Sequence, residues 1–210
     1  MSGRYSFLIL LLALSGCATR ELPPVSVYAL HPSAGSPPPA ERRGRATLKL
    51  APLHGIQPFT TTGMLYTEHG TDLNRFAFSR WADAPTRMLQ PILVEALERS
   101  GLFNAVLPPG SAFRGDLSLE GTLLDFSLHF DGSRPRAVAE VRFLLLDDVR
   151  RRVVASRLFH SEVPIAKADA EEAASALERA TAEISRKLIH WLKPLVEQRR
   201  RPPHDSTAGS

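Results

Sequence analysis

The segment that decides the fold is Asp116–Phe130, DLSLEGTLLDFSLHF, in which apolar side chains alternate with polar ones. Two sets of apolar residues follow one another along it: Leu117, Leu119 and Leu123, then Leu124, Phe126, Leu128 and Phe130. Each set falls on one face of an extended chain, because successive side chains of a strand point to opposite sides. The second set is out of phase by one residue, which a β-bulge near Gly121–Leu124 would produce. The segment predicts a long, bulged strand.

Two further strand patterns follow at short distance. Asp131-Gly132-Ser133 predicts a turn, and Ala137–Leu146 is almost continuously apolar after Arg142. Residues 147–151 predict a second turn before a third strand over Val153–Val163. Connections this short join antiparallel strands, because a parallel crossover needs about a dozen residues or more. The sequence therefore predicts a three-stranded antiparallel meander.

A long amphipathic helix is predicted after Pro164, beginning at Asp169 or Lys167. Its apolar residues recur at the helical period: Ala173, Leu177, Ala180, Ile184, Leu188, Trp191 and Leu195. Pro194 is expected to kink or end the helix in its last turn. Residues 198–210 are rich in Arg, Pro and Ser and are predicted to form a disordered basic tail.

A shorter helix is predicted upstream, with residues 79–85 leading into it. Asp83 is expected to cap the first amides, and Pro85 is tolerated in the first turn because its missing N–H has no helical partner there. Pro91 predicts either a kink or a helix that starts properly only near Gln90. The expected core face consists of Leu89, Ile92, Leu93, Ala96 and Leu97.

Shorter strands complete the predicted fold. They are Val25–Leu30, Ala46–Leu53, Met64–Thr67, Leu73–Phe78 and Leu102–Leu107. Gly70 supplies a turn between the third and fourth of these, which predicts a hairpin, and Gly101 is a natural C-terminal helix cap. Residues of about 32–44 form a Pro- and Gly-rich linker. We therefore expect one α+β domain over residues 25–197, a largely antiparallel sheet with the meander, covered by two helices.

The N-terminus resembles the signal of a bacterial lipoprotein. An apolar run, Phe7–Leu14, follows Arg4 and is too short to cross a bilayer as a helix, which needs roughly 20 residues. The four residues that close it match the lipobox: Leu14, Ser15, Gly16 and Cys17. This resemblance predicts that residues 1–16 are a signal peptide and that cleavage leaves Cys17 as the N-terminus.

The lipobox also implies a fate for the mature N-terminus. The Cys17 thiol would carry a diacylglycerol, with palmitate-type acyl chains that hold the protein on a membrane. Residues 17–24 would form a lipidated tether ending in Pro23-Pro24. Ala18 follows the Cys where an Asp would favour the inner membrane, so the periplasmic face of the outer membrane is expected. Because Cys17 is the single cysteine, no disulfide within the chain is expected.

The chain carries a formal net charge of +4, and its arginines are clustered. The clusters are Arg42-Arg43-Arg45, Arg150-Arg151-Arg152 and Arg199-Arg200-Arg201. Such clusters are typical of solvated loops, and they can also contact anionic lipid. Nucleic-acid binding is not expected, because it needs a basic stripe with interleaved aromatic residues and access to the cytoplasm.

Local catalytic signatures are absent from the sequence. The seven histidines are scattered without an HExxH arrangement, and no GxSxG, SxxK or GxxxxGK[ST] motif occurs. Asp147-Asp148 has the composition of a tight turn, and His129 and His160 are expected to be ordinary sheet residues rather than ligands. We therefore predict no catalytic residues, no metal site and no cofactor; a site assembled from distant segments stays open.

The order of elements resembles the ABC-type transport auxiliary lipoproteins, a family that includes the paraquat-inducible C-type lipoprotein. The matching segments are the lipobox, Tyr28-Ala29-Leu30, Phe78-Ser79-Arg80-Trp81, Leu93–Leu97, Leu124-Asp125-Phe126, Val153–Phe159 and Ala173–Leu177. Residues 54–63 depart from the family, which has an acidic or Arg-Pro segment there. No partner contact is therefore carried over to that loop.

The resemblance implies a non-catalytic partner of an Mce-type lipid transport system. Such systems combine a cytoplasmic ATPase and a permease with a periplasmic Mce-domain protein that carries lipid between the membranes. This chain would be the outer-membrane end of the assembly, docking the Mce-domain protein and forming a homo-oligomeric ring. Two alternatives stay open: a lipoprotein of lipopolysaccharide-export or secretion machinery, and a periplasmic hydrolase.

Overall fold

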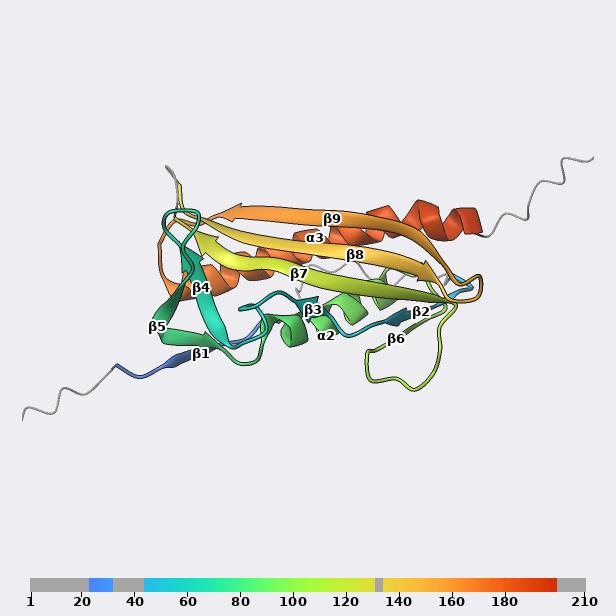
Figure 1. Cartoon of the computed structure of the whole chain (residues 1–210), viewed down its shortest axis with the longest axis horizontal. Coiled ribbons are helices and arrows are strands. Elements are labelled where there is room, and N and C mark those ends of the chain that lie inside the picture. The colour runs from blue at the N-terminus through green and yellow to red at the C-terminus, as the bar shows by residue number, and fades with distance from the viewer. Residues whose placement is uncertain (1–22, 32–43, 131–133, 200–210) are drawn as a thin grey trace, which may run out of the picture.

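The computed structural model describes residues 23–31, 44–130 and 134–199, which form an α+β domain (Figure 1). The predicted fold class is confirmed. In chain order the elements are β1 (Ser26–Tyr28), β2 (Thr47–Leu50), β3 (His54–Gly55), β4 (Gly63–Thr67), β5 (Asn74–Trp81), α2 (Pro85–Arg99), β6 (Ala105–Leu107), β7 (Leu117–His129), β8 (Arg136–Asp147), β9 (Arg152–Pro164) and α3 (Ala170–Arg199).

The long strand β7 contains the predicted bulge. Its register against β8 shifts between Leu123 and Asp125, so Leu124 has no partner residue. The bulge moves the inward face from odd to even positions, and both Leu119 and Leu128 are fully buried. The change of phase in the sequence therefore keeps one continuous face of β7 in the core.

β7 is also the strand on which the sheet is assembled. On one edge it pairs antiparallel with β8, which pairs antiparallel with β9, as the meander prediction requires. On its other edge three short strands, β2, β3 and β4, pair with it in succession and in parallel. The alternation did not predict these parallel pairs, because alternation reveals which face is buried and not which strand is the neighbour.

The meander closes through the predicted turn after Asp147. Arg151 in this turn has a positive φ of 52°, which is unusual for a residue with a side chain. The other predicted turn, at residues 131–133, lies outside the described residues.

α3 begins as predicted, because Asp169 Oδ1 accepts the N–H of Glu172 at 2.8 Å. The helix does not end at Pro194 but continues to Arg199, so Gln198 and Arg199 belong to it rather than to a tail. Near the end its buried stripe moves to Leu192 and Val196, whereas the predicted Trp191 and Leu195 are half-buried. Residues 200–210 lie outside the described part.

The start of α2 differs from the prediction. β5 continues to Trp81, whose side chain is fully buried, so residues 79–81 end a strand instead of leading into a helix. The N-cap is Ala84, without a side-chain cap; Asp83 instead accepts the N–H of Ala84 and pairs with Arg87. α2 starts at Pro85 and runs through Pro91, so a start near Gln90 is wrong.

Some of the remaining local predictions are confirmed and others are not. The hairpin of β4 and β5 is confirmed, and Gly70 in its turn has φ 77°; Gly101 after α2 has φ 65°, as its capping role requires. The strand expected over Val25–Leu30 is the shorter β1, in and around which Val25, Val27 and Ala29 are exposed, whereas Tyr28 and Leu30 pack toward the core. Of the predicted linker only Gly44 is described.

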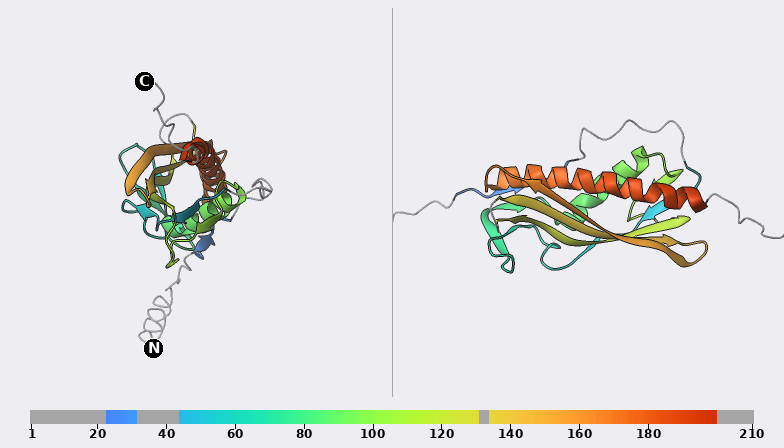
Figure 2. Two further views of the ribbon diagram at one scale, coloured as in Figure 1. Left: turned by 90° about the vertical axis from the view of Figure 1, so that its right-hand side faces the viewer. Right: turned by 90° about the horizontal axis from the view of Figure 1, so that it is seen from above.

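The domain is long and narrow, and α3 lies along the length of the sheet (Figure 2). Viewed down the long axis, the sheet and the two helices surround the core, with α3 against β8 and β9. β1 lies at one end and the C-terminus of α3 at the other (Figure 1). Among the described helices none is long and apolar enough to cross a membrane.

Candidate functional site

The two ends of the long axis differ in chemistry. We call the end with β1 and the adjoining part of β5 the tether end. The opposite end, here the basic end, comprises residues 45–49, 114–118, 146–153 and 195–199. Figure 1 shows that this second end unites the β8–β9 turn, the start of β7, β2 and the end of α3.

A buried carboxylate, Asp147, organises the basic end. It is 1% exposed, and its Oδ1 accepts the backbone N–H of Arg150 at 2.9 Å. The guanidinium groups of Arg150 and Arg199 lie 3.0 and 3.1 Å from its oxygens. Burial alone raises the pKa of Asp147, but the hydrogen bonds from Arg150 and the charge of Arg199 outweigh burial and lower it. Asp147 therefore ties the turn to the end of α3.

Gly115 allows a second segment to join this end. A Cβ at this position would lie 2.7 Å from the Leu117 carbonyl oxygen and 2.9 Å from the Lys49 nitrogen. Asp116 fixes the same approach, because its Oδ2 accepts the N–H of Thr47 at 2.7 Å. Only glycine fits against the backbone of β2 in this way, and the approach brings Arg114 beside Lys49.

A pocket of about 470 Å³ opens between these segments. Four cationic side chains line it: Lys49, Arg114, Arg151 and Arg152. Within the described residues none of the four forms an ion pair, whereas the nearby Asp148 accepts the Ser118 hydroxyl at 2.5 Å. Asp147 and Asp148 also line the pocket, so four cations face two carboxylates and the pocket keeps an excess of positive charge.

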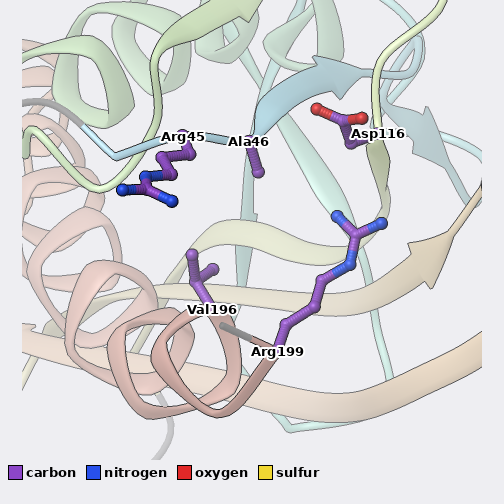
Figure 3. Close-up of a pocket in the computed structure, with 5 residues that line it drawn as sticks. All are labelled: Arg45, Ala46, Asp116, Val196 and Arg199. Atoms are coloured by element: carbon purple, nitrogen blue, oxygen red, sulfur yellow. The ribbon is translucent and has the colours of Figure 1, made fainter. Parts of the chain in front are cut away.

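A second pocket, of about 570 Å³, lies beside the first and is lined by Arg45, Ala46, Asp116, Val196 and Arg199. Figure 3 shows the Arg199 side chain reaching from α3 toward Asp116, with Arg45 on another side of the opening. Arg199 thus joins this pocket to the Asp147 site, and the whole end carries an excess of positive charge.

The three arginine clusters of the sequence converge here as far as they are described. Arg45, Arg150–Arg152 and Arg199 all lie at the basic end; residues 42, 43, 200 and 201 lie outside the described part. The prediction of solvated loops is wrong for Arg199, which lies in α3 and is 18% exposed; Arg150 does lie in an exposed turn, and it pairs with the buried carboxylate as well. The sequence carried no signal for this burial, because the composition around Asp147 is that of any polar turn.

The lipobox residues Leu14, Ser15, Gly16 and Cys17 lie outside the described residues. The two histidines predicted to be ordinary sheet residues lie on strands: the His129 ring contacts Asp125 at 2.9 Å, and the His160 ring lies between Glu140 and Glu162, at 3.2 and 3.1 Å.

Another polar group is the exposed β4–β5 turn, where Glu68, His69 and Asp72 lie close together. The Asp72 carboxylate already accepts the N–H groups of Glu68 and His69 and the hydroxyl of Thr67, so it organises the turn. These hydrogen bonds, led by that from the His69 backbone, lower the pKa of Asp72.

The tether end has a different surface. Val25 and Val27 are 53% and 52% exposed, and Phe78 on the neighbouring β5 is 42% exposed. Single exposed apolar side chains are common on protein surfaces, and here three of them lie on or next to the paired strands β1 and β5.

Comparison with known proteins assigns the family. The sequence profile described as "ABC-type transport auxiliary lipoprotein component" matches residues 28–188, from β1 through most of α3, and the chain belongs to this family. A crystal structure of a Xanthomonas campestris protein matches with a TM-score of 0.73 and 27% identity, over 83% of this chain and 98% of that one. The crystal structure of an uncharacterized protein matches with a TM-score of 0.63 and 19% identity, over 81% and 99%.

A curated relative is longer than this chain. An uncharacterized protein of Bradyrhizobium diazoefficiens is 27% identical over 154 residues, which are 73% of this chain and 41% of the relative. The chain therefore spans less than half the length of that relative.

Proposed function

We propose that this protein is a non-catalytic, lipid-anchored subunit of an Mce-type ABC transport system that moves lipid between the inner and outer membranes. The observation that carries the proposal is the family match, which spans residues 28–188 and so covers nearly the whole folded domain. The subunit acts from the periplasmic face of the outer membrane and partners an Mce-domain protein, a permease and an ATPase.

The lipobox supports the anchor. Cleavage before Cys17 leaves an eight-residue tether, residues 17–24, ahead of the domain. A chain of this length reaches at most about 28 Å when fully extended, at about 3.5 Å per residue. Two or more acyl chains on Cys17 bind a bilayer stably, since one chain alone gives only marginal attachment. The tether end is therefore held near the membrane.

The fold then orients the domain. Because β1 directly follows the tether and lies at one end of the long axis, the basic end is the end farthest from the anchor (Figure 1). A partner that extends from the inner membrane meets the basic end first. This arrangement gives the two ends separate tasks, attachment at one and contact with the transport system at the other.

The partner is identified by purification of the full-length chain with a C-terminal affinity tag from gently solubilised membranes, followed by mass spectrometry. The expected result is enrichment of an Mce-domain protein together with its permease or ATPase. Enrichment of lipopolysaccharide-export or secretion components in their place would contradict the proposal and support the alternative envelope role.

The anchor is tested separately by growth with an alkyne analogue of palmitate. The wild-type chain is expected to take up the label and to fractionate with outer membranes on a density gradient. The Cys17→Ser variant, which keeps the rest of the chain, is expected to lose the label. Equal labelling of both chains, or sedimentation of the wild type with inner membranes, would contradict the proposed anchor or its location.

A further inference from the structure

We propose that the basic end binds the phosphate-bearing headgroup of a phospholipid in the pocket lined by Lys49, Arg114, Arg151 and Arg152. This inference deepens the proposed function and rests on it, because it names the class of lipid that the subunit contacts. Nothing in the family assignment specifies a ligand or a surface that would take one.

Several cationic side chains that form no ion pair with a described residue line one concave site. The four side chains come from three separate segments, β2, the loop before β7, and the β8–β9 turn with the first residue of β9, and all line the same pocket of about 470 Å³. Phosphate groups are commonly bound by convergent Arg and Lys side chains, which supply charge and several N–H donors. A cluster that only solvates a loop has no need to converge in this way.

The carboxylates near the pocket already have hydrogen-bond or ion-pair partners. Asp147 is held by Arg150 and Arg199, Asp148 by the Ser118 hydroxyl, and Asp116 by the N–H of Thr47. Each acidic group near the pocket therefore has a structural partner within the basic end. Four cations thus face two carboxylates, Asp147 and Asp148, in the lining of the pocket, so the lining keeps an excess of positive charge that is available to an anion from outside.

The backbone of Arg151 has an unusual conformation. A non-glycine residue with φ 52° lies in the left-handed region, where its Cβ crowds the following carbonyl oxygen and the backbone is strained. Glycine or asparagine would occupy this turn position with less strain, and the sequence has arginine. Strain of this kind is found at functional sites, where the surrounding structure imposes it. Here the strained residue is one of the four cations that line the pocket.

Apolar groups beside the cations favour a lipid over a simple anion. Leu146 and Val153 line the pocket; Val153, at the start of β9, is 57% exposed, and Val149, in the turn before it, is 66% exposed. A phospholipid presents a phosphate next to an apolar glycerol ester region, which matches this combination. In contrast, the space between the helices and the sheet, bounded by residues such as Leu93 and Phe143, is only about 10 Å³. That space does not admit an acyl chain, so the contact is made by the headgroup.

The proposal is tested with the purified full-length protein in dodecyl maltoside, a detergent without phosphate. Dihexanoylphosphatidylglycerol, dihexanoylglycerol and inorganic phosphate are titrated separately by isothermal calorimetry. The phospholipid is expected to bind saturably, inorganic phosphate at least tenfold more weakly, and dihexanoylglycerol not at all. The assay needs no transport partner, so its outcome is independent of whether the proposed partner co-purifies.

The variant for this test is Arg114→Gln/Arg151→Gly, which removes two cations and relieves the strained φ, so that the fold is retained. Its affinity for the phospholipid is expected to fall at least tenfold. The single variant Arg151→Lys keeps the charge and is expected to retain most of the wild-type affinity for the phospholipid. The matched control is Arg80→Gln, because Arg80 is an exposed arginine of the tether end; its affinity should equal that of the wild type.

Three outcomes would overturn the proposal. Equal affinity of wild type and double variant would place the lipid elsewhere. Inorganic phosphate binding as tightly as the phospholipid would make this a site for a small anion. Absence of saturable phospholipid binding by the wild type would overturn it as well, and loss of the co-purified partner from the double variant would then assign the basic end to an acidic protein surface.

Discussion

The tether end and the basic end differ in how their charged side chains are paired and buried. At the tether side of the molecule Asp83 and Arg87 pair with each other on the surface, where an ion pair contributes little to stability. At the basic end the carboxylate Asp147 is buried, and two arginines hold it. The remaining cations of that end have no carboxylate partner among the described residues.

This difference separates the charged residues that stabilise the fold from those that can contact a ligand. A buried carboxylate needs its cations, so Arg150 and Arg199 contribute to the fold and not to a ligand. The cations beside them form no ion pair with a described carboxylate, and they make the surface of this end positively charged. The tether end exposes Val25, Val27 and Phe78, which suits an end held beside a membrane; the basic end also exposes apolar side chains, so the two ends differ in charge and not in apolar exposure.

The largest effect is expected from Asp147→Asn. Loss of this charge leaves Arg150 and Arg199 without their common partner, and breaking a buried ion pair typically costs about 3–5 kcal/mol. We expect the free energy of unfolding to fall by about 3 kcal/mol in urea titrations followed by circular dichroism. The matched control is Asp83→Asn at the other side, for which no resolvable change is expected. Equal effects of the two substitutions would remove the distinction between the ends.

Gly115→Ala is expected to have the next largest effect. The added Cβ would meet backbone atoms of Leu117 and Lys49 at 2.7–2.9 Å, and backbone cannot move aside as a flexible side chain can. Overpacking of this kind costs about 1–3 kcal/mol. Gly110→Ala is the control, because a Cβ there meets nothing within 4 Å. If Gly115→Ala matched this control in thermal unfolding, the close approach of the loop to β2 would be wrong.

Acid should weaken the basic end through the same group, because protonation of Asp147 removes the charge that holds Arg150 and Arg199. The pKa of Asp147 is lowered from its ordinary value of 3.8. The unfolded chain therefore binds the proton more readily, and the stabilisation present above about pH 4 is lost as the pH falls through the folded-state pKa. We expect the melting temperature to fall below pH 4, and to fall less steeply in Asp147→Asn. Parallel pH profiles would contradict this assignment.

The smallest effect is expected from Arg151→Gly, and its sign is positive. Relief of the left-handed φ returns about 1–2 kcal/mol, and the greater freedom of glycine in the unfolded chain offsets roughly 0.5–1 kcal/mol of it. A net gain of about 0.5 kcal/mol is expected in urea unfolding. A loss of stability would show that the Arg151 side chain supports the fold, which would weaken the argument that it is free for a ligand.

The sequence predicted the parts of the fold that depend on local pattern. The bulge in β7 was visible as a change of phase, and the long stripe of α3 as a helical period. The parallel pairing of β2, β3 and β4 along β7 was missed, because it depends on neighbours distant in the sequence. Val25 and Val27 alternate as a buried strand does but face outward, since alternation alone does not say which side is covered.

The candidate site was predicted only as separate clusters. Arg150–Arg152 and Arg199 were recognised as basic segments, and the sequence did not show that they meet. Their meeting depends on the length of α3 beyond Pro194 and on the glycine that admits the 114–116 segment. The burial of Asp147 follows from the same assembly. Composition near Asp147-Asp148 is that of a turn whether or not the carboxylate is buried.

The most direct test of the account is to find what each end touches in intact cells. The photoreactive amino acid p-benzoylphenylalanine replaces either Phe113, 76% exposed beside Arg114, or Phe78, 42% exposed at the tether end. After illumination, the account predicts cross-links from position 113 to the periplasmic subunit of an ABC transport system, and from position 78 to the membrane without that subunit. Capture of the transport subunit at position 78, with none at position 113, would contradict the division of tasks between the two ends.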